Sequence, residues 1–272
     1  MRTPPIEERL PRPSVVGIVN VTPDSFSDGG RHLDPAAAVA AARRMVEEGA
    51  ALVDVGGEST RPGAAPVGLD EELRRVVPVL ERLEGLPLSV DTAKAEVARR
   101  AIALGAELVN DVTALRGDEE LAGVVADGGV GLCLMHMQGE PRTMQLAPTY
   151  ADVAGEVAAF LEERLAVAVA AGVREEHVCL DPGFGFGKTS QQNFELLRRL
   201  DVLLALGRPV LVGLSRKSSL GRLFDPAART GSLAASLGAA VAAYDRGASV
   251  FRVHDVREHV EALTAAAAVT VA

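Results

Sequence analysis

The 272-residue sequence contains no tryptophan, only 3% aromatic residues and two cysteines. A core with so few aromatic rings must be built mostly from Ala, Val and Leu. The hydrophobic fraction of 48% is large enough for a sizeable α/β domain. Cys133 and Cys179 each lie inside an apolar, strand-like stretch, so we expect two buried free thiols rather than a disulfide.

Segments that target or anchor a chain are also missing. Residues 1–13 are rich in Pro and charge, without the apolar stretch of a signal peptide, and no later run is long enough to cross a bilayer. The net charge of −9 argues against general binding to nucleic acid or to an anionic membrane, but leaves room for a local anion site. We therefore expect a cytoplasmic protein that binds neither nucleic acid nor membrane.

Lysine and asparagine are scarce. Three lysines occur among 28 basic residues, with three asparagines: Lys94, Lys188, Lys217, Asn20, Asn110 and Asn193. An Arg-rich, Asn-poor composition is typical of a heat-adapted or GC-rich source. In such a background, a Lys or Asn at the end of a strand is less expected as filler.

Apolar and helical segments alternate along the chain. Short apolar runs predict eight strands, at 14–19, 51–55, 86–90, 107–109, 130–134, 178–180, 209–212 and 250–253. Helices are predicted at about 35–48, 70–84, 93–104, 118–126, 150–171, 190–206, 232–246 and 255–268. Glycine, the expected helix stop, follows several of them, as at Gly49, Gly105 and Gly247. Residues 1–13 are predicted to be an irregular lead-in.

Eight strand–helix units with short connections favour a parallel sheet. Eight units in about 250 residues fit a single (β/α)₈ TIM barrel, which we predict for residues 14–272. The alternative is an open doubly wound sheet. That fold would normally carry a dinucleotide fingerprint after its first strand, and Asn20-Val21-Thr22-Pro23 is not one.

Polar residues follow nearly every predicted strand. The strand ends carry Asn20, the loop at 56–61, Asp91, Asn110, Asp111, Met135, His136, Asp181, the segment 215–217 and the segment 252–254. The strand beginnings, by contrast, are mostly small or apolar residues such as Ala, Pro and Val. Because active sites of TIM barrels lie at the carboxyl ends of the strands, this asymmetry predicts one polar mouth.

The acids and the amide at these strand ends indicate the kind of ligand. Asp91, Asn110 and Asp181 supply acceptors that suit a flat, nitrogen-rich heterocycle with an amidine-like or guanidine-like edge. Lys217 adds a donor for a ring carbonyl or ring nitrogen. Each strand-end Asp has a plainer interpretation as the cap of the next helix.

A second corner of the mouth suits an anion. Arg252 and His254 follow the eighth strand, which neighbours the first strand and Asn20 once the barrel closes. Arg, His and Asn together are typical of a phosphate or metal–phosphate site.

The most distinctive stretch is V-C-L-D-P-G-F-G-F-G-K, residues 178–188, where glycines alternate with Phe184 and Phe186. We call its glycine-rich part, residues 183–187, the glycine run. It is not a P-loop, because Gly183 precedes Gly187 by one residue too few and Pro182 stands at the required first glycine. The sequence also has no dinucleotide pattern G-x-G-x-x-G here, no H-E-x-x-H and no C-x-x-C. Roles for Lys188, His136 and Glu58 stay open, since each could be solvated or could only brace its loop.

Eight motifs, taken in order, resemble one known family. They lie at 17–30 (G-I-V-N-V-T-P-D-S-F-S-D-G-G), 54–63 (D-V-G-G-E-S-T-R-P-G), 89–92 (S-V-D-T), 109–112 (V-N-D-V), 134–139 (L-M-H-M-Q-G), 181–189 (D-P-G-F-G-F-G-K-T), 215–218 (S-R-K-S) and 252–256 (R-V-H-D-V). Together they cover essentially the whole chain and resemble the dihydropteroate synthases, pterin-binding enzymes of the folate pathway. The first two motifs and the glycine run are specific, whereas the shorter ones are weak individually.

The resemblance implies a reaction and a division of the mouth. 6-Hydroxymethyl-7,8-dihydropterin diphosphate would react with 4-aminobenzoate, in the presence of Mg²⁺, to give 7,8-dihydropteroate and diphosphate. The residues implied for the pterin are Asp91, Asn110, Met135, Asp181, Phe186 and Lys217. Those implied for the diphosphate are Asn20, Arg252 and His254, with Asn20 as the metal ligand. Those implied around 4-aminobenzoate, where sulfonamide drugs would compete, are Thr60, Arg61, Pro62, Phe186 and Ser218.

Asp91, Lys217, Arg252 and His254 would be the catalytic residues on this basis, in a homodimer. The loops at 21–31 and 56–68 are expected to close over the diphosphate and to form the aminobenzoate pocket. The alternatives are a methyltetrahydrofolate-dependent methyltransferase of the same barrel class and a non-catalytic pterin-binding protein. The first would not need the S-T-R-P-G and V-T-P-D-S-F-S-D loops, and the second could lose Asn20, Arg252 or His254.

Overall fold

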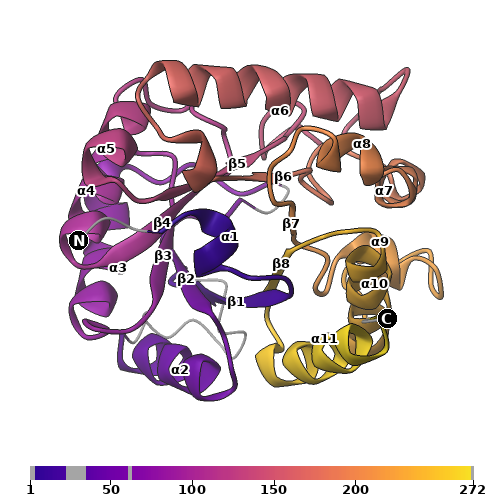
Figure 1. Cartoon of the computed structure of the whole chain (residues 1–272), viewed down its shortest axis with the longest axis horizontal. Coiled ribbons are helices and arrows are strands. Elements are labelled where there is room, and N and C mark those ends of the chain that lie inside the picture. Colours follow the sequence, from indigo (N-terminus) through magenta and orange to yellow (C-terminus); the bar gives the residue numbers. More distant parts are fainter. Residues whose placement is uncertain (1–3, 23–34, 61–62, 271–272) are drawn as a thin grey trace.

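The computed structural model describes residues 4–22, 35–60 and 63–270, which form a nearly closed barrel of eight parallel strands surrounded by helices (Figure 1). The strands are β1 (Ser14–Asn20), β2 (Leu52–Gly56), β3 (Leu88–Asp91), β4 (Ala106–Asp111), β5 (Gly131–Met135), β6 (Val178–Asp181), β7 (Leu211–Val212) and β8 (Val250–Val253). Their order is β6-β5-β4-β3-β2-β1-β8-β7, and a parallel bridge between Leu180 and Val210 joins the two ends. The predicted TIM barrel is confirmed.

Helices follow the strands in the predicted alternation. They are α2 (Pro35–Glu47), α3 (Leu69–Glu81), α4 (Ala95–Ala103), α5 (Leu121–Gly128), α6 (Val153–Ala170), η1 (Glu175–His177), α7 (Ser190–Arg198), α8 (Asp201–Leu204), α9 (Ser218–Gly221), α10 (Leu233–Asp245) and α11 (Val256–Thr270). The single helix predicted for 190–206 is two helices, because the chain turns at Arg199 and brings Leu200 and Leu203 into the core. The one-turn helix α9 is too short for hydrophobic periodicity to reveal it.

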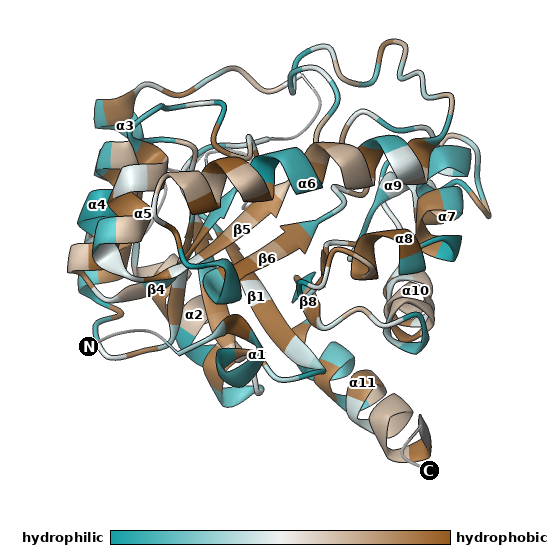
Figure 2. Ribbon diagram, turned by 45° about the horizontal axis from the view of Figure 1, so that its top comes forward, coloured by the Kyte–Doolittle hydropathy of each residue, from teal (hydrophilic) through white to brown (hydrophobic). Residues whose placement is uncertain are grey.

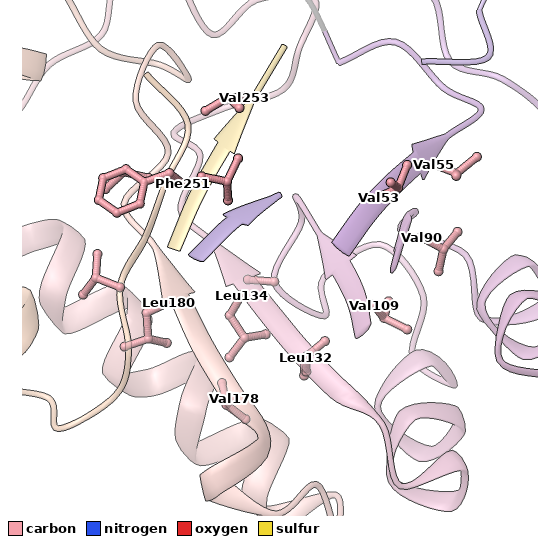
Figure 3. Close-up of a cluster of buried hydrophobic side chains, with 14 of the residues drawn as sticks. Val53, Val55, Val90, Val109, Leu132, Leu134, Val178, Leu180, Phe251 and Val253 are labelled. Atoms are coloured by element: carbon pink, nitrogen blue, oxygen red, sulfur yellow. The ribbon is translucent and has the colours of Figure 1, made fainter. Parts of the chain in front are cut away.

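Alternation along the strands divides the apolar residues into two layers. Val53, Leu132 and Phe251 belong to the layer that packs against helix residues such as Val76 and Leu161 (Figure 3). Successive side chains of a strand point to opposite faces, so the residues between them face the barrel interior. Figure 2 shows the result, with strands that are mostly hydrophobic and helices that are polar on one side.

The lower half of the barrel interior is an apolar plug. Residues of seven strands meet there in one cluster: Val16, Leu52, Leu108, Cys133, Cys179, Leu211 and Val250. Both cysteines are free and fully buried, as predicted.

The lead-in at 1–13 completes this plug. The prediction that this segment is irregular is wrong for its described part, which forms the short helix α1 (Ile6–Arg9). In Figure 1, α1 lies over the middle of the barrel. Ile6 and Leu10 are buried in the plug, so burial of apolar side chains orders the segment. Where the barrel domain begins therefore stays a prediction.

Among the described residues, no helix combines the length and the apolar character that a membrane span requires.

Candidate active site

A polar layer replaces the apolar plug at the carboxyl ends of the strands. On five strands it begins two residues beyond the plug, at positions that face the same way. Asp54 follows Leu52, Asn110 follows Leu108, Met135 follows Cys133, Asp181 follows Cys179 and Arg252 follows Val250, while Asp91 ends β3. The structure thus brings the predicted residues Asp91, Asn110, Met135, Asp181 and Arg252 to one mouth.

Arg252 joins two of the acids of this layer. Its Nε donates to Asp54 Oδ2 at 2.6 Å and its Nη2 donates to Asp91 Oδ2 at 2.6 Å. Burial would lower the pKa of Arg252, but the two carboxylates outweigh burial, so the net shift is upward. Burial raises the pKa of Asp91, an effect that Arg252 opposes. The guanidinium is therefore a fixed cation between two strand-borne acids.

Asp54 is a site residue that the sequence analysis missed. Besides Arg252, its carboxylate accepts hydrogen bonds from Ser89 Oγ at 2.5 Å and from Asn110 Nδ2 at 3.2 Å. Its signal was an acid in the middle of the buried strand L-V-D-V-G, where a charge is costly unless it is paired. Asp54 stands two residues before the end of β2, whereas the polar residues that mark the mouth in the sequence follow the strands.

Asn110 presents a free acceptor to the mouth. Because its Nδ2 donates to Asp54, the orientation of the amide is set, and Oδ1 is buried without a hydrogen-bond partner. Buried polar atoms are rarely left unpaired, so an unpaired carbonyl oxygen here indicates a place for a ligand N–H.

The opposite wall combines an acid, a cation and an aromatic ring. Asp181 Oδ1 accepts the backbone N–H of Gly183 at 2.7 Å, and burial raises the pKa of this carboxyl group. Lys217 Nζ lies 4.3 Å from the centroid of the Phe186 ring, and burial lowers the pKa of Lys217 to about 8. Phe186 packs on the cluster that contains Met135. Of the two phenylalanines in the glycine run, Phe184 is in the core, so Phe186 is the one that reaches the site.

Lys188 is buried, so the possibility that it is solvated is excluded. Its Nζ contacts three acceptors: His136 Nδ1 at 2.9 Å, the Gly183 carbonyl oxygen at 3.0 Å and the Phe186 carbonyl oxygen at 3.1 Å. These match the three N–H bonds of an ammonium group. Burial lowers the pKa of His136 to about 2, so its ring is neutral and Nδ1 accepts. Lys188 and His136 thus hold the glycine run from below.

The glycine run forms a wall and not a phosphate cradle. The backbone N–H groups of Gly183 and Gly185 are taken by Asp181 Oδ1 and by Asn193 Oδ1, at 2.7 and 2.8 Å. At Gly183, which has φ of +67°, a Cβ atom would lie 1.9 Å from the His136 carbonyl oxygen. Only glycine allows this close approach of the two loops. Directly after the glycine run, Thr189 and Gln192 form a capping box that begins α7.

His254 lies on β8's connection to α11, beside the segment that follows β7. Ser215 Oγ accepts the backbone N–H of His254 at 3.2 Å and lies 3.2 Å from its Nδ1. Because the Ser215 oxygen already accepts this backbone N–H, its hydroxyl proton can be donated to Nδ1 of His254. The ring proton of neutral His254 is then on Nε2, which is free to donate. Burial lowers the pKa of His254 to about 4, so the neutral ring prevails near pH 7. Asn20 ends the neighbouring strand β1 and is half-buried.

The loop after β2 carries the residues implied for 4-aminobenzoate. Thr60 is half-buried, and Ser218 opens α9 directly after Lys217. Arg61 and Pro62 lie outside the described residues, as does most of the loop at 21–31. Glu58 braces the β2 loop, because its Oε1 accepts the backbone N–H of Val67 at 3.1 Å.

This geometry agrees with comparison to known proteins. The family model described as pterin binding enzyme matches residues 16–254. The chain belongs to the pterin-binding enzyme family.

The relatives identify the branch of the family. Dihydropteroate synthase of Escherichia coli K12 is 49% identical over 259 residues, which is 93% of this chain and 90% of the relative. A Yersinia pestis dihydropteroate synthase solved with a sulfonamide drug has a TM-score of 0.89 and 46% identity, over 96% of this chain and 95% of that one. The Xanthomonas albilineans enzyme was solved with 4-aminobenzoic acid (TM-score 0.87, 51% identity, 96% and 94% covered) and with 7,8-dihydropteroate (TM-score 0.85, 49% identity, 96% and 95% covered).

The donor set of this pterin-binding enzyme suits a metal that arrives with its substrate. Among the residues described, no three His, Cys, Asp or Glu side chains gather in a way that could hold a metal ion. Asn20 offers one amide oxygen, a ligand type that Mg²⁺ accepts, and Mg²⁺ commonly takes most of its other ligands from phosphates and water. Within the described part of the chain, the donors therefore fit a metal that Asn20 would share with a diphosphate.

Proposed function

We infer that this chain is a transferase of folate biosynthesis that condenses 6-hydroxymethyl-7,8-dihydropterin diphosphate with 4-aminobenzoate, giving 7,8-dihydropteroate and diphosphate. The observation that carries this inference is the buried layer of acids around the unpaired Oδ1 of Asn110. A pterin edge offers ring N–H and amino groups to such acceptors. The identity of about half of the residues with dihydropteroate synthases supports the same reaction.

The pterin ring is proposed to lie between the two walls of the mouth. Asp91, Asn110 and Asp181 would accept from its N–H edge, and Lys217 would donate to a ring oxygen or nitrogen. Met135 and Phe186 would pack on its faces. The position of the Lys217 ammonium group over the Phe186 ring supports this placement of the pterin. A hydrogen-bond donor and a flat apolar surface lie next to each other there, as a pterin ring requires.

The diphosphate is proposed to bind at the corner of Asn20 and His254. The Nε2–H that Ser215 leaves exposed on a neutral His254 suits a phosphate oxygen. Arg252 also stays a predicted diphosphate ligand, although two of its nitrogens are engaged by Asp54 and Asp91. Its geometry supports a second role, in which it pairs with the pterin-side acids Asp54 and Asp91 and holds them in place.

In the reaction, the C–O bond to diphosphate breaks, a C–N bond to the amine forms, and the amine loses one proton. Charge develops on the departing diphosphate, where cationic and N–H donors lower the barrier. Mg²⁺, with Asn20 as its protein ligand, would neutralise part of this charge when it is bound. The aryl amine is a weak nucleophile that is already neutral, so the two segments that carry Thr60 and Ser218 have to position it and not to activate it.

Release of diphosphate tests the proposal. The purified chain is mixed with the pterin diphosphate and Mg²⁺, with and without 4-aminobenzoate, and diphosphate is measured by a coupled assay. We expect release only with both substrates, and its loss when the metal is chelated. An Arg199→Met variant, which removes the exposed ion pair with Asp152 between the end of α7 and the start of α6, should keep full activity. No release, or release without 4-aminobenzoate, would contradict the assignment.

Three further properties are proposed with it: inhibition by sulfonamides, a homodimer and a cytoplasmic location. The Yersinia pestis enzyme solved with a sulfonamide supports the first. Competition of a sulfonamide with 4-aminobenzoate and sedimentation of the purified chain test the first two. No observation favours the methyltransferase or the non-catalytic alternative over the synthase.

A further inference from the structure

A second group of polar and charged side chains lies outside the polar layer, at the base of the β2 loop. It consists of Glu58, Glu72, Thr92 and Lys94, and we call it the loop latch. Lys94 Nζ contacts Glu58 Oε2 at 2.5 Å and Glu72 Oε2 at 2.5 Å. Thr92 Oγ1 donates to Glu72 Oε1 at 2.6 Å, so the fully buried carboxylate of Glu72 is paired at both oxygens.

The latch closes the loop across its base. Glu58 stands near the beginning of the loop, and its second oxygen accepts the N–H of Val67, near the end. One carboxylate therefore links the two ends, while Lys94 ties that carboxylate to α3 through Glu72. Just before Glu58, Arg75 Nη1 donates to the Gly57 carbonyl oxygen at 2.9 Å, which secures the chain where it leaves β2.

The latch also stands between the two halves of the proposed site. Thr60, implied for 4-aminobenzoate, is two residues from Glu58. Thr92 directly follows Asp91, implied for the pterin, and its Oγ1 accepts the backbone N–H of Lys94 at 3.2 Å. Movement of Lys94 would thus shift the loop while the strand-borne acids stay in place.

We propose that Lys94 is a positioning residue for 4-aminobenzoate. Through Glu58 it sets the place of the loop that carries Thr60, and it touches neither substrate. The inference rests on the function proposed above. Burial would lower the pKa of Lys94, but Glu58 and Glu72 outweigh burial and raise it, so Lys94 stays charged near pH 7. Without this cation, repulsion from Glu72 and attraction to water draw Glu58 outward, and the base of the loop opens.

Separate Michaelis constants for the two substrates test the proposal. We expect Lys94→Met to raise KM for 4-aminobenzoate about tenfold, the loss of one charge-assisted contact, with kcat and KM for the pterin diphosphate nearly unchanged. Lys94→Arg should restore most of the affinity, since the cation is kept. Arg99→Met, which removes an exposed ion pair with Glu96 on the same helix, is the matched control and should change neither constant.

A second variant covers the case in which Lys94→Met fails to fold. Glu58→Gln keeps an acceptor for the Val67 N–H but weakens the bond to Lys94, and it should also raise only KM for 4-aminobenzoate. The double variant should cost less than the sum of the single ones, because both remove the same contact. Equal rises of both Michaelis constants, or no rise, would overturn the inference.

Hydrogen exchange separates this inference from the proposed function. The Val67 amide should exchange faster in Lys94→Met than in the unaltered chain, whether or not the chain makes dihydropteroate. Faster exchange in an inactive chain would overturn the function and keep the latch. Unchanged exchange in an active chain would overturn the latch and keep the function.

Discussion

The polar layer and the loop latch each place one cation between two carboxylates, with different means. Arg252 joins Asp54 and Asp91, which stand on rigid strands, whereas Lys94 joins Glu58 on a loop to Glu72 on a helix. A guanidinium is a planar fork that requires its partners at set positions, and an ammonium is a point charge on a flexible stem. The difference teaches that strand geometry fixes the acids on the pterin side of the mouth. On the aminobenzoate side, the loop is held by an ion pair whose partners can shift without breaking it.

The largest expected effect comes from Arg252. Arg252→Met leaves Asp54 and Asp91 buried without their cation, which should lower the free energy of unfolding by about 3–5 kcal/mol in urea denaturation. Arg252→Lys should not restore it, because one ammonium group cannot reproduce two parallel N–H contacts to separate strands. Full rescue by Lys would remove the contrast with Lys94, where exchange of Lys for Arg is expected to be tolerated.

Asn110→Ala comes next and should act on the ligand more than on the fold. It deletes the unpaired Oδ1, so pterin affinity measured by calorimetry should fall by about 1–3 kcal/mol, the cost of one lost buried hydrogen bond. Affinity for 4-aminobenzoate in the ternary complex should change much less. Equal losses for both ligands would show that the two halves of the mouth are not separate.

A further lysine, Lys188, extends the comparison, since it is buried among neutral acceptors. Its partner His136 has a pKa lowered to about 2, against 6.5 when unfolded, so the folded chain binds fewer protons between these values and loses stability as pH falls. Between pH 7 and 5 this loss amounts to roughly 2 kcal/mol. His136→Asn keeps an acceptor for Lys188 and should remove that part of the pH dependence. Identical pH profiles of unfolding would show that His136 is not held neutral.

The smallest effect is expected at Gly57. A Cβ atom there would lie 2.6 Å from Val76 Cγ2 and 3.0 Å from Glu72 Cγ, so Gly57→Ala should displace the loop base at a cost of about 1 kcal/mol. Affinity for 4-aminobenzoate should fall, and pterin affinity should hold. Gly63→Ala lies in the same loop with no atom within 4 Å of the new Cβ, although its positive φ of +84° adds local strain. A larger loss of 4-aminobenzoate affinity at Gly63 than at Gly57 would contradict the latch geometry.

Much of the fold could be predicted because its signals are local. Apolar runs and glycine stops each depend on a few neighbouring residues, and they predicted eight strands and a barrel. The strand-end rule found Asp91, Asn110 and Asp181 for the same reason. That rule missed Asp54, because Asp54 stands inside its strand. The burial of Ile6 and Leu10 in the plug could not be predicted either, because it depends on the closed barrel.

The scarcity of lysine and asparagine is itself a signal of structural roles. Lys94, Lys188 and Asn193 were not assigned roles from the sequence, yet each makes hydrogen bonds or ion pairs that hold a loop of the mouth. In a chain with three lysines and three asparagines, their positions alone could have marked them.

By itself the sequence determined the alternation of strands and helices, the polar mouth and the family, because these follow from spacing and from short motifs. Only the tertiary structure decided which charges meet. Arg252 reaches Asp54 across 198 residues, and Lys94 reaches Glu58 across 36. Such pairs form because closing the barrel brings distant strand ends within hydrogen-bond distance, which no local pattern records.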